Sequence, residues 1–278
     1  MKKVFKYIGI TLMSLVAIGA ILFFIYLKPF MDKMKVTETI QLDPSITLVT
    51  GGGGNSGIIV GDSLVVVIDT KMDDAATEFH KQVMNLAGSK PILVINTHWH
   101  PDHVGGNKLF ANQQILAGGS YDQDEWIKEA GKESLPTQWL LSQQIIPLGN
   151  DTLIVFNLAK DVHTPSDVMV YLPGHKLLFG GDVILNKQAP VLMGKASAAA
   201  YEEVLASLPS KMDIKTVVPG HGKIGGPEII TDFAAYFTDM REAASNSNKE
   251  EELVAKYKEW NQIPFFMSPK ATIDHYKK

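Results

Sequence analysis

The stretch NTHWHPDHVGGN, residues 96–107, decides the fold because it combines a strand end with a dense group of ligand-type side chains. It follows the apolar run ILVI at 92–95, and within six positions it holds His98, His100, Asp102 and His103. Imidazole and carboxylate groups do not belong in a protein interior without partners, so packing alone does not explain them. Pro101 and the glycine pair at 105–106 fix the loop and let it turn. The stretch therefore indicates a tight loop that carries ligands at the end of a buried strand.

Three further ligand-type residues follow other apolar runs. His163 comes after TLIVFN, Asp182 ends KLLFGGD, and His221 lies in TVVPGHG. If these runs are strands of one packed pair of sheets, their ends meet at one edge, where loops commonly carry functional residues. The chain then offers seven ligand candidates, five histidines and two aspartates.

Composition bounds the class of protein. The chain has 278 residues, 45% hydrophobic and 20% charged, which is typical of a globular protein with one sizeable core. Its formal net charge is −4 and it has no long Lys/Arg block, so no nucleic-acid partner is expected. It has no cysteine, which excludes disulfides, thiolate nucleophiles and Cys-based zinc sites. Any metal must be held by histidine and carboxylate.

The N-terminus differs from the rest of the chain. Residues 8–27 carry no charge and are almost wholly apolar, and as a helix they would span roughly 30 Å, the thickness of a bilayer core. We expect a transmembrane anchor and linker over 1–35 and one main globular domain over 36–278. A cleaved signal peptide is the alternative, although AIGA at 17–20 is a poor cleavage site. The lysines before the apolar run favour a cytoplasmic N-terminus and a catalytic domain outside the cytoplasm.

Periodicity predicts strands interleaved with helices. Short runs rich in Val, Ile and Leu predict strands at 38–42, 46–50, 57–61, 64–69, 91–96, 152–157, 168–172, 176–180 and 215–218. Helical patterns occur at 73–88, 120–130, 198–208 and 227–245. Many strands first, then strands mixed with helices, indicate sheet layers covered by helices.

The glycine-rich TGGGGNSG at 50–57 resembles a phosphate-binding loop only superficially. A P-loop needs Lys and Ser/Thr after its glycines and then a helix, whereas IIV follows here and predicts a strand. We expect a hairpin turn, which is also a candidate lining for a pocket.

Other polar and aromatic residues receive no functional role. His80, His175 and His275 are expected at the surface, and Trp99 is expected to pack or to line the rim of the site. For the loop residues near the expected ligands we favour solvated positions, with substrate contact as the alternative. These are Asn107, Asn186 and Lys187.

Together these motifs resemble the metallo-β-lactamase superfamily over residues 38–225. The resemblance implies an α+β fold, an αββα four-layer sandwich of metal-dependent hydrolases. It assigns His98, His100 and His163 to a first metal, and Asp102, His103 and His221 to a second. Asp182 would bridge both ions.

The aspartate at position 182 indicates which branch of the superfamily the chain resembles. Metallo-β-lactamases proper commonly carry Cys or Ser there, whereas glyoxalase II-like and lactonase-like hydrolases carry Asp. The phrases HTPSD, YLPGHKLLFGGDV and VVPGHG also resemble the branch with the SoxH-like hydrolases. Ser166 departs from the glycine of many members, with a small expected effect.

The implied chemistry is hydrolysis of a small-molecule ester, thioester, lactone or amide. Two divalent ions share a water and lower its pKa, so that a metal-bound hydroxide attacks the carbonyl while Asp102 orients it and accepts a proton. Two zinc ions are the first expectation, and the ligand set also admits iron or a mixed pair. The alternatives are a β-lactamase, against which Asp182 counts, and an iron-binding redox member. The sequence indicates no oligomeric state.

Overall fold

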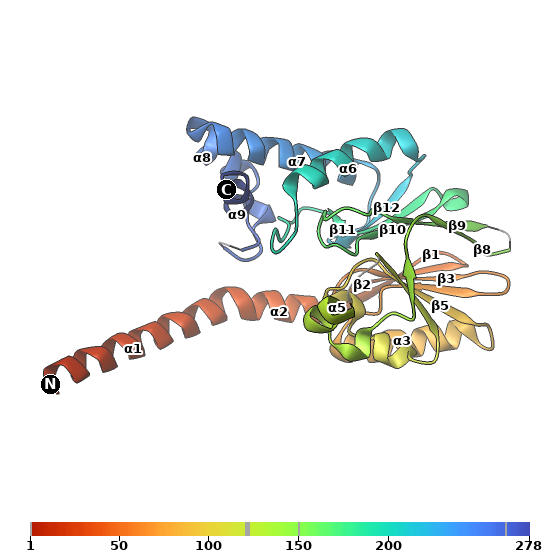
Figure 1. Cartoon of the computed structure of the whole chain (residues 1–278), viewed down its shortest axis with the longest axis horizontal. Coiled ribbons are helices and arrows are strands. Elements are labelled where there is room, and N and C mark those ends of the chain that lie inside the picture. Colours follow the sequence, from red (N-terminus) through yellow and green to blue (C-terminus); the bar gives the residue numbers. More distant parts are fainter. Residues whose placement is uncertain (1, 120–122, 150, 265) are drawn as a thin grey trace.

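Two β-sheets pack face to face, and helices cover the outer face of each (Figure 1). This confirms the predicted αββα sandwich. The computed structural model describes residues 2–119, 123–149, 151–264 and 266–278.

The first sheet has the strand order β1-β2-β3-β4-β5-β6-β7. β1 to β4 form an antiparallel meander, and β4 to β7 run parallel to one another. The strands are β1 (Thr37–Asp43), β2 (Ile46–Gly51), β3 (Ser56–Val60), β4 (Val65–Ile68), β5 (Ile92–Asn96), β6 (Gln114–Gly118) and β7 (Gln138–Leu140). β4 and β5 are buried on both faces, which explains their uninterrupted apolar sequences.

Helix α3 (Asp73–Ala87) covers the outer face of this sheet. Its Phe79 and Val83 are buried in one cluster with Val67 of β4 and Val94 of β5. These apolar side chains recur at helical spacing on one face of the helix, and their burial against the strands holds the helix on the sheet.

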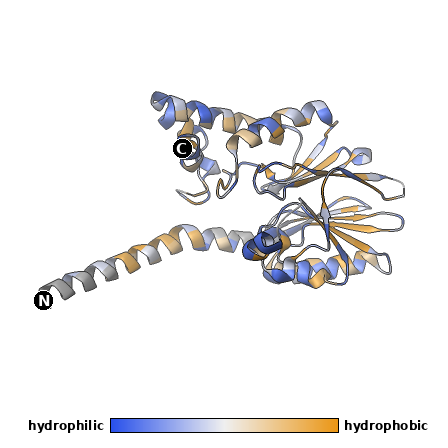
Figure 2. Ribbon diagram, viewed as in Figure 1, coloured by the Kyte–Doolittle hydropathy of each residue, from blue (hydrophilic) through white to orange (hydrophobic). Residues whose placement is uncertain are grey.

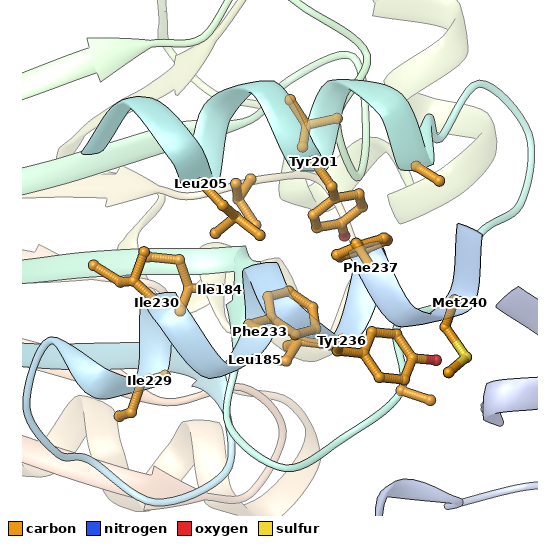
Figure 3. Packing of buried hydrophobic residues seen from close by; sticks show 14 of the residues in the cluster. Ile184, Leu185, Tyr201, Leu205, Ile229, Ile230, Phe233, Tyr236, Phe237 and Met240 are labelled. Atoms are coloured by element: carbon orange, nitrogen blue, oxygen red, sulfur yellow. The ribbon is translucent and has the colours of Figure 1, made fainter. Parts of the chain in front are cut away.

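The second sheet has the order β12-β11-β10-β9-β8, in which only β11 and β12 are parallel. Its strands are β8 (Gln144–Pro147), β9 (Thr152–Asn157), β10 (Val168–Leu172), β11 (Leu177–Leu185) and β12 (Thr216–His221). The covering helices are α6 (Ala198–Lys211), α7 (Glu228–Ser245), α8 (Ser247–Lys256) and α9 (Pro269–Tyr276). In Figure 3, Tyr201 of α6 stacks on Phe237 of α7, with ring centroids 4.7 Å apart, above Ile184 and Leu185 of β11.

The core between the sheets is aliphatic. Leu48, Val66 and Ile95 of the first sheet are buried in one cluster with Val170 and Phe179 of the second. Figure 2 shows hydrophobic residues along the strands and mixed residues along the covering helices. Each fully buried side chain of this kind contributes about 1.5–3 kcal/mol, so this layer holds the sheets together.

The N-terminal segment projects away from the sandwich (Figure 1). It is divided into α1 (Lys2–Leu22), a π-helix η1 (Phe23–Leu27) and α2 (Lys28–Lys35), so the apolar run 8–27 does not form one continuous α-helix. Among the residues that the structure describes, no helix is both long and apolar enough to cross a bilayer. The predicted transmembrane helix is therefore not supported.

Several short or polar elements were not predicted from periodicity. β6, β7 and β8 have only three to five residues each, and α8 has Leu253 as its buried residue. Runs this short, or this polar, give a weak periodic signal. The helix expected at 120–130 is α5 (Gln123–Ala130), and the first three residues of that prediction lie outside the described residues.

Candidate metal centre

All seven predicted ligand residues lie together at one edge of the sandwich. They form two groups of potential metal ligands, in each of which the donor atoms lie within 4.8 Å of one another. The first group is His98, His100, His163 and Asp182, and the second is Asp102, His103 and His221. Both sheets contribute to each group.

The first sheet supplies its four ligands from the end of β5. His98 and His100 follow the strand directly, and the single-turn helix α4 (Pro101–Val104) carries the other two. Pro101 occupies the first helical position, and the amides of His103 and Val104 donate to the carbonyl of His100. This tight turn directs His98 and His100 toward the first group and Asp102 and His103 toward the second.

The second sheet supplies the remaining ligands from three strands. His163 follows β9 and His221 ends β12, as expected. Asp182 lies within β11 instead of after it, because that strand continues to Leu185 past a register irregularity at Gly181. Gly181 has φ of +51°, which re-aims the chain next to the aspartate.

In the first group, the Nδ1 of His100 lies 3.0 Å from the Nε2 of His98 and 2.9 Å from the Nε2 of His163. The Oδ2 of Asp182 lies 3.4 Å from the Nε2 of His163 and 4.0 Å from that of His98. Ligands held about 2.05 Å from a tetrahedral ion are about 3.4 Å apart. The donor spacing is thus that of ligands around one ion.

In the second group, the Oδ2 of Asp102 lies 3.0 Å from the Nε2 of His221 and 3.5 Å from the Nε2 of His103. The two ring nitrogens are 3.4 Å apart. This spacing also suits one ion.

Asp182 lies between the groups. Its Oδ1 is 3.2 Å from the Nε2 of His103, and its Oδ2 is 3.6 Å from the Nε2 of His221. Oδ1 is buried without a hydrogen-bond partner in the described part of the chain. A buried carboxylate oxygen facing ring nitrogens is costly unless a cation neutralises it, so the donor set fits bound metal.

The rings of the first group are kept neutral. Burial lowers the pKa of His98 and His100, and it lowers the pKa of His163 to about 3. A neutral imidazole has a free lone pair on one ring nitrogen, which is the form that binds a metal.

The second group is shaped by opposite charges. Burial by itself lowers the pKa of His103, but the carboxylates of Asp102, Asp182 and Asp69 raise it well above its ordinary value. Burial raises the pKa of Asp182, yet the rings of His221 and His103 hold it well below its usual range. This mutual stabilisation marks an ionic cluster that a divalent cation would join in place of protons.

Two aspartates that support the ligands were not singled out from the sequence. Asp69, next to the end of β4, lies 2.7 Å from the Nδ1 of His103 through its Oδ2 and accepts hydrogen bonds from Thr97. Asp167 accepts hydrogen bonds from the amides of His163 and Thr164. Asp69 follows the apolar run VVVI, so the strand-end criterion used for the ligands would have found it.

A groove of about 600 Å³ opens beside the second group. Its lining combines the hairpin turn at 51–55 with Glu38, Gln188, His221 and Lys223. The turn connects β2 to β3, so the predicted hairpin is confirmed.

The other residues considered in the sequence analysis lie outside the two donor groups. Trp99 is buried and packs edge-to-face on Trp126, as predicted, and Lys187 is exposed. His80 and His275 are partly exposed.

The expected solvated position of Asn107 is wrong. Asn107 is fully buried in η2 (Asn107–Phe110), where it exchanges hydrogen bonds with Asn96 and donates to the carbonyl of Ser134. His175 lies at the surface with a partly exposed side chain, and there its Nδ1 lies 2.7 Å from Asp151 and its Nε2 lies 2.9 Å from Asp43.

An αββα sandwich with two His/Asp donor groups at one edge is the architecture that the sequence motifs led us to expect. Comparison with known proteins identifies the family. The family model described as the metallo-beta-lactamase superfamily matches residues 49–221. The chain belongs to this superfamily, whose members are metal-dependent hydrolases.

Characterised relatives carry different activities. The chain is 26% identical to a type 2 metallo-beta-lactamase of Bacteroides fragilis, over 70% of this chain and 81% of the relative. It is 29% identical to the type 2 enzyme of Bacillus cereus, over 62% and 68%. It is 22% identical to an acyl-coenzyme A thioesterase of Gallus gallus, over 68% and 79%.

Solved structures share the fold. A metallo-beta-lactamase from Pontibacter korlensis superposes with a TM-score of 0.63 at 21% identity, over 73% of this chain and 99% of that one. The sec-alkylsulfatase Pisa1 from Pseudomonas sp. gives 0.60 at 19% identity, over 80% and 44%.

Proposed function

We propose that the protein is a binuclear metal-dependent hydrolase that cleaves an ester, thioester, lactone or amide bond of a small molecule. The observation that carries this proposal is the position of Asp182, whose two carboxylate oxygens lie 3.2 Å from His103 and 3.4 Å from His163. One carboxylate that faces both donor groups suits two ions better than one.

The residues have distinct roles in this proposal. His98, His100 and His163 hold one ion, Asp102, His103 and His221 hold the other, and Asp182 contacts both. A bound pair of divalent ions supplies Lewis acidity and a water of lowered pKa. Asp102, beside His221 at the groove, would orient the attacking water and accept its proton. Zinc is the favoured metal because the donors are imidazole and carboxylate.

The curated relatives support two substrate classes. The β-lactamases at 26% and 29% identity favour a β-lactam amide, and the thioesterase at 22% favours an acyl thioester. We favour the ester, thioester and lactone group, because the sequence carries an aspartate at position 182.

The test is metal analysis of the purified full chain, with hydrolysis of a panel containing an aryl ester, an acyl thioester, a lactone and a chromogenic β-lactam. We expect about two zinc ions per chain and turnover of at least one of the first three substrates. His163→Ala should abolish turnover, whereas His275→Ala, a histidine outside the site, should not. Zinc-loaded protein that hydrolyses none of the four, or iron with oxidation of a substrate, would overturn the proposal.

The location of the catalytic domain outside the cytoplasm stays a prediction from the sequence. Fractionation of cells that express the full chain tests it.

A further inference from the structure

The glycine loop, which we define as residues 51–55, lies against the second donor group. The amide of Gly54 donates to the carbonyl of Asp102 at 3.1 Å. A Cβ at Gly54 would lie 2.1 Å from the ring of His103, and one at Gly53 would lie 2.3 Å from the carbonyl oxygen of Asp102. Only glycine allows so close an approach, so the loop backbone forms one wall around both ligands.

The end of the same loop fixes the third ligand of this group. The buried Asn55 donates through its amide to the carbonyl of Gly220 at 2.7 Å. Its side-chain Nδ2 donates to the carbonyls of Pro219 at 2.8 Å and Gly222 at 2.9 Å. These carbonyls lie on both sides of His221, so one asparagine holds the backbone that carries this ring.

Lys71 holds the loop from within the protein. Its side chain is fully buried, and its Nζ lies 2.5 Å from the carbonyl oxygens of Val49 and Gly54. The ammonium therefore joins the end of β2 to the glycine that touches Asp102 and His103.

The three histidines of the first donor group receive no direct support from this loop. In the described ranges no hydrogen bond joins the glycine loop to His98, His100 or His163. We propose that Asn55 and Lys71 are positioning residues that set the metal affinity of the second donor group and leave that of the first unchanged. The inference rests on the proposed two-ion site.

Zinc titration of the metal-free full chain tests it. His221→Ala identifies the binding step that belongs to the second group. In Asn55→Ala and Lys71→Met, that step should weaken by roughly tenfold or more, while the other step keeps its affinity. Equal weakening of both steps, or no change in either, would overturn the inference.

Two matched controls lie outside the loop. The Nδ2 of Asn157 donates to the carbonyl of Leu140 at 2.8 Å, and the Nζ of Lys90 donates to that of Gly61 at 2.8 Å. Asn157→Ala and Lys90→Met remove the same kinds of bond and should leave both zinc steps unchanged. If zinc binding to the second donor group weakened equally in these controls, the loss of any such hydrogen bond would have the same effect on affinity. That result would contradict the inference.

A second readout needs no metal. In the metal-free protein, ring ¹⁵N resonances of His103 and His221 should shift in Asn55→Ala, and those of His98 and His163 should not. If the wild-type chain bound only one ion, the two-ion proposal would fail, and these resonances would still decide whether Asn55 positions the second group. Unshifted His103 and His221 resonances would count against the inference.

Discussion

The Nδ1 of His103 lies 2.7 Å from the Oδ2 of Asp69, and both side chains are fully buried. The Nδ1 donates to the carboxylate, so Nε2 is the ring nitrogen that faces Asp102 and Asp182 and that a metal ion would take. The carboxylate also accepts hydrogen bonds from Thr97, so its own position is fixed.

Asp69→Ala should therefore weaken metal binding by the second group. Loss of a carboxylate behind a ligating histidine typically costs 10–100-fold in metal affinity, about 1.4–2.7 kcal/mol. Zinc titration measures it, with the exposed Asp74→Ala as the control. An unchanged second step would show that Asp69 does not orient His103.

Asp182→Ala should lower the affinity of both groups for metal. The carboxylate contacts ligands of each group, and its removal leaves two cations without their shared anion. Zinc per chain after dialysis is the measurement. Full zinc content in the variant would exclude Asp182 as the bridge.

Asp102→Asn should lower the turnover while the first group keeps its metal ion. The amide keeps the shape of the side chain but loses its charge and basicity, so the first group should retain its ion. We expect turnover to fall by about 10²–10⁴-fold if proton transfer is the main loss. Near-normal turnover at full zinc loading would remove Asp102 from the mechanism.

Lys71 should give the metal-free protein a pH-dependent stability. Burial lowers the pKa of Lys71 to about 7, from an ordinary value of 10.5. Between these values the unfolded chain binds the extra proton, so the free energy of unfolding should rise with pH, by at most about 1.4 kcal/mol per unit. The penalty is complete below about pH 7. Urea unfolding at pH 7, 8 and 9 should show this rise relative to Lys71→Met; parallel curves for the two proteins would contradict it.

His175 should stabilise the sandwich without affecting the metal groups. It joins Asp151, in the turn before β9 of the second sheet, to Asp43, at the end of β1 of the first. His175→Ala should lower the free energy of unfolding by about 0.5–1.5 kcal/mol and leave zinc content unchanged. A double-mutant cycle with Asp43→Asn isolates the contact between the sheets, and additive effects would show no coupling.

Local patterns predicted sheet layers covered by helices and the clustering of the seven candidate residues, and the family resemblance supplied the αββα arrangement. Apolar runs mark the buried strands, and His or Asp directly after them marks one edge. Asp69 directly follows the apolar run VVVI, and the same rule applied there would have added it to the candidates. Asp182 was expected after its strand, since a register irregularity inside β11 leaves no periodic signal.

Contacts between distant segments were beyond sequence reasoning. TGGGGNSG was predicted as a hairpin turn, yet Asn55 binds Pro219, 164 residues away, and no pattern within either segment records that pairing. His175 was expected at the surface and Asn107 in a solvated loop, both without a partner. Their partners come from other loops, so the tertiary fold buries or pairs them.

Each donor group takes side chains from both sheets, and the two sheets form from successive halves of the domain. An ion in either group is therefore a cross-link between the halves, one that forms only when both have folded. Its contribution grows with the free metal concentration, about 2.7 kcal/mol per site at one hundred times Kd. Metal binding at these groups would therefore stabilise the joined sheets as well as supply the chemistry, and metal-free protein should unfold more readily than loaded protein.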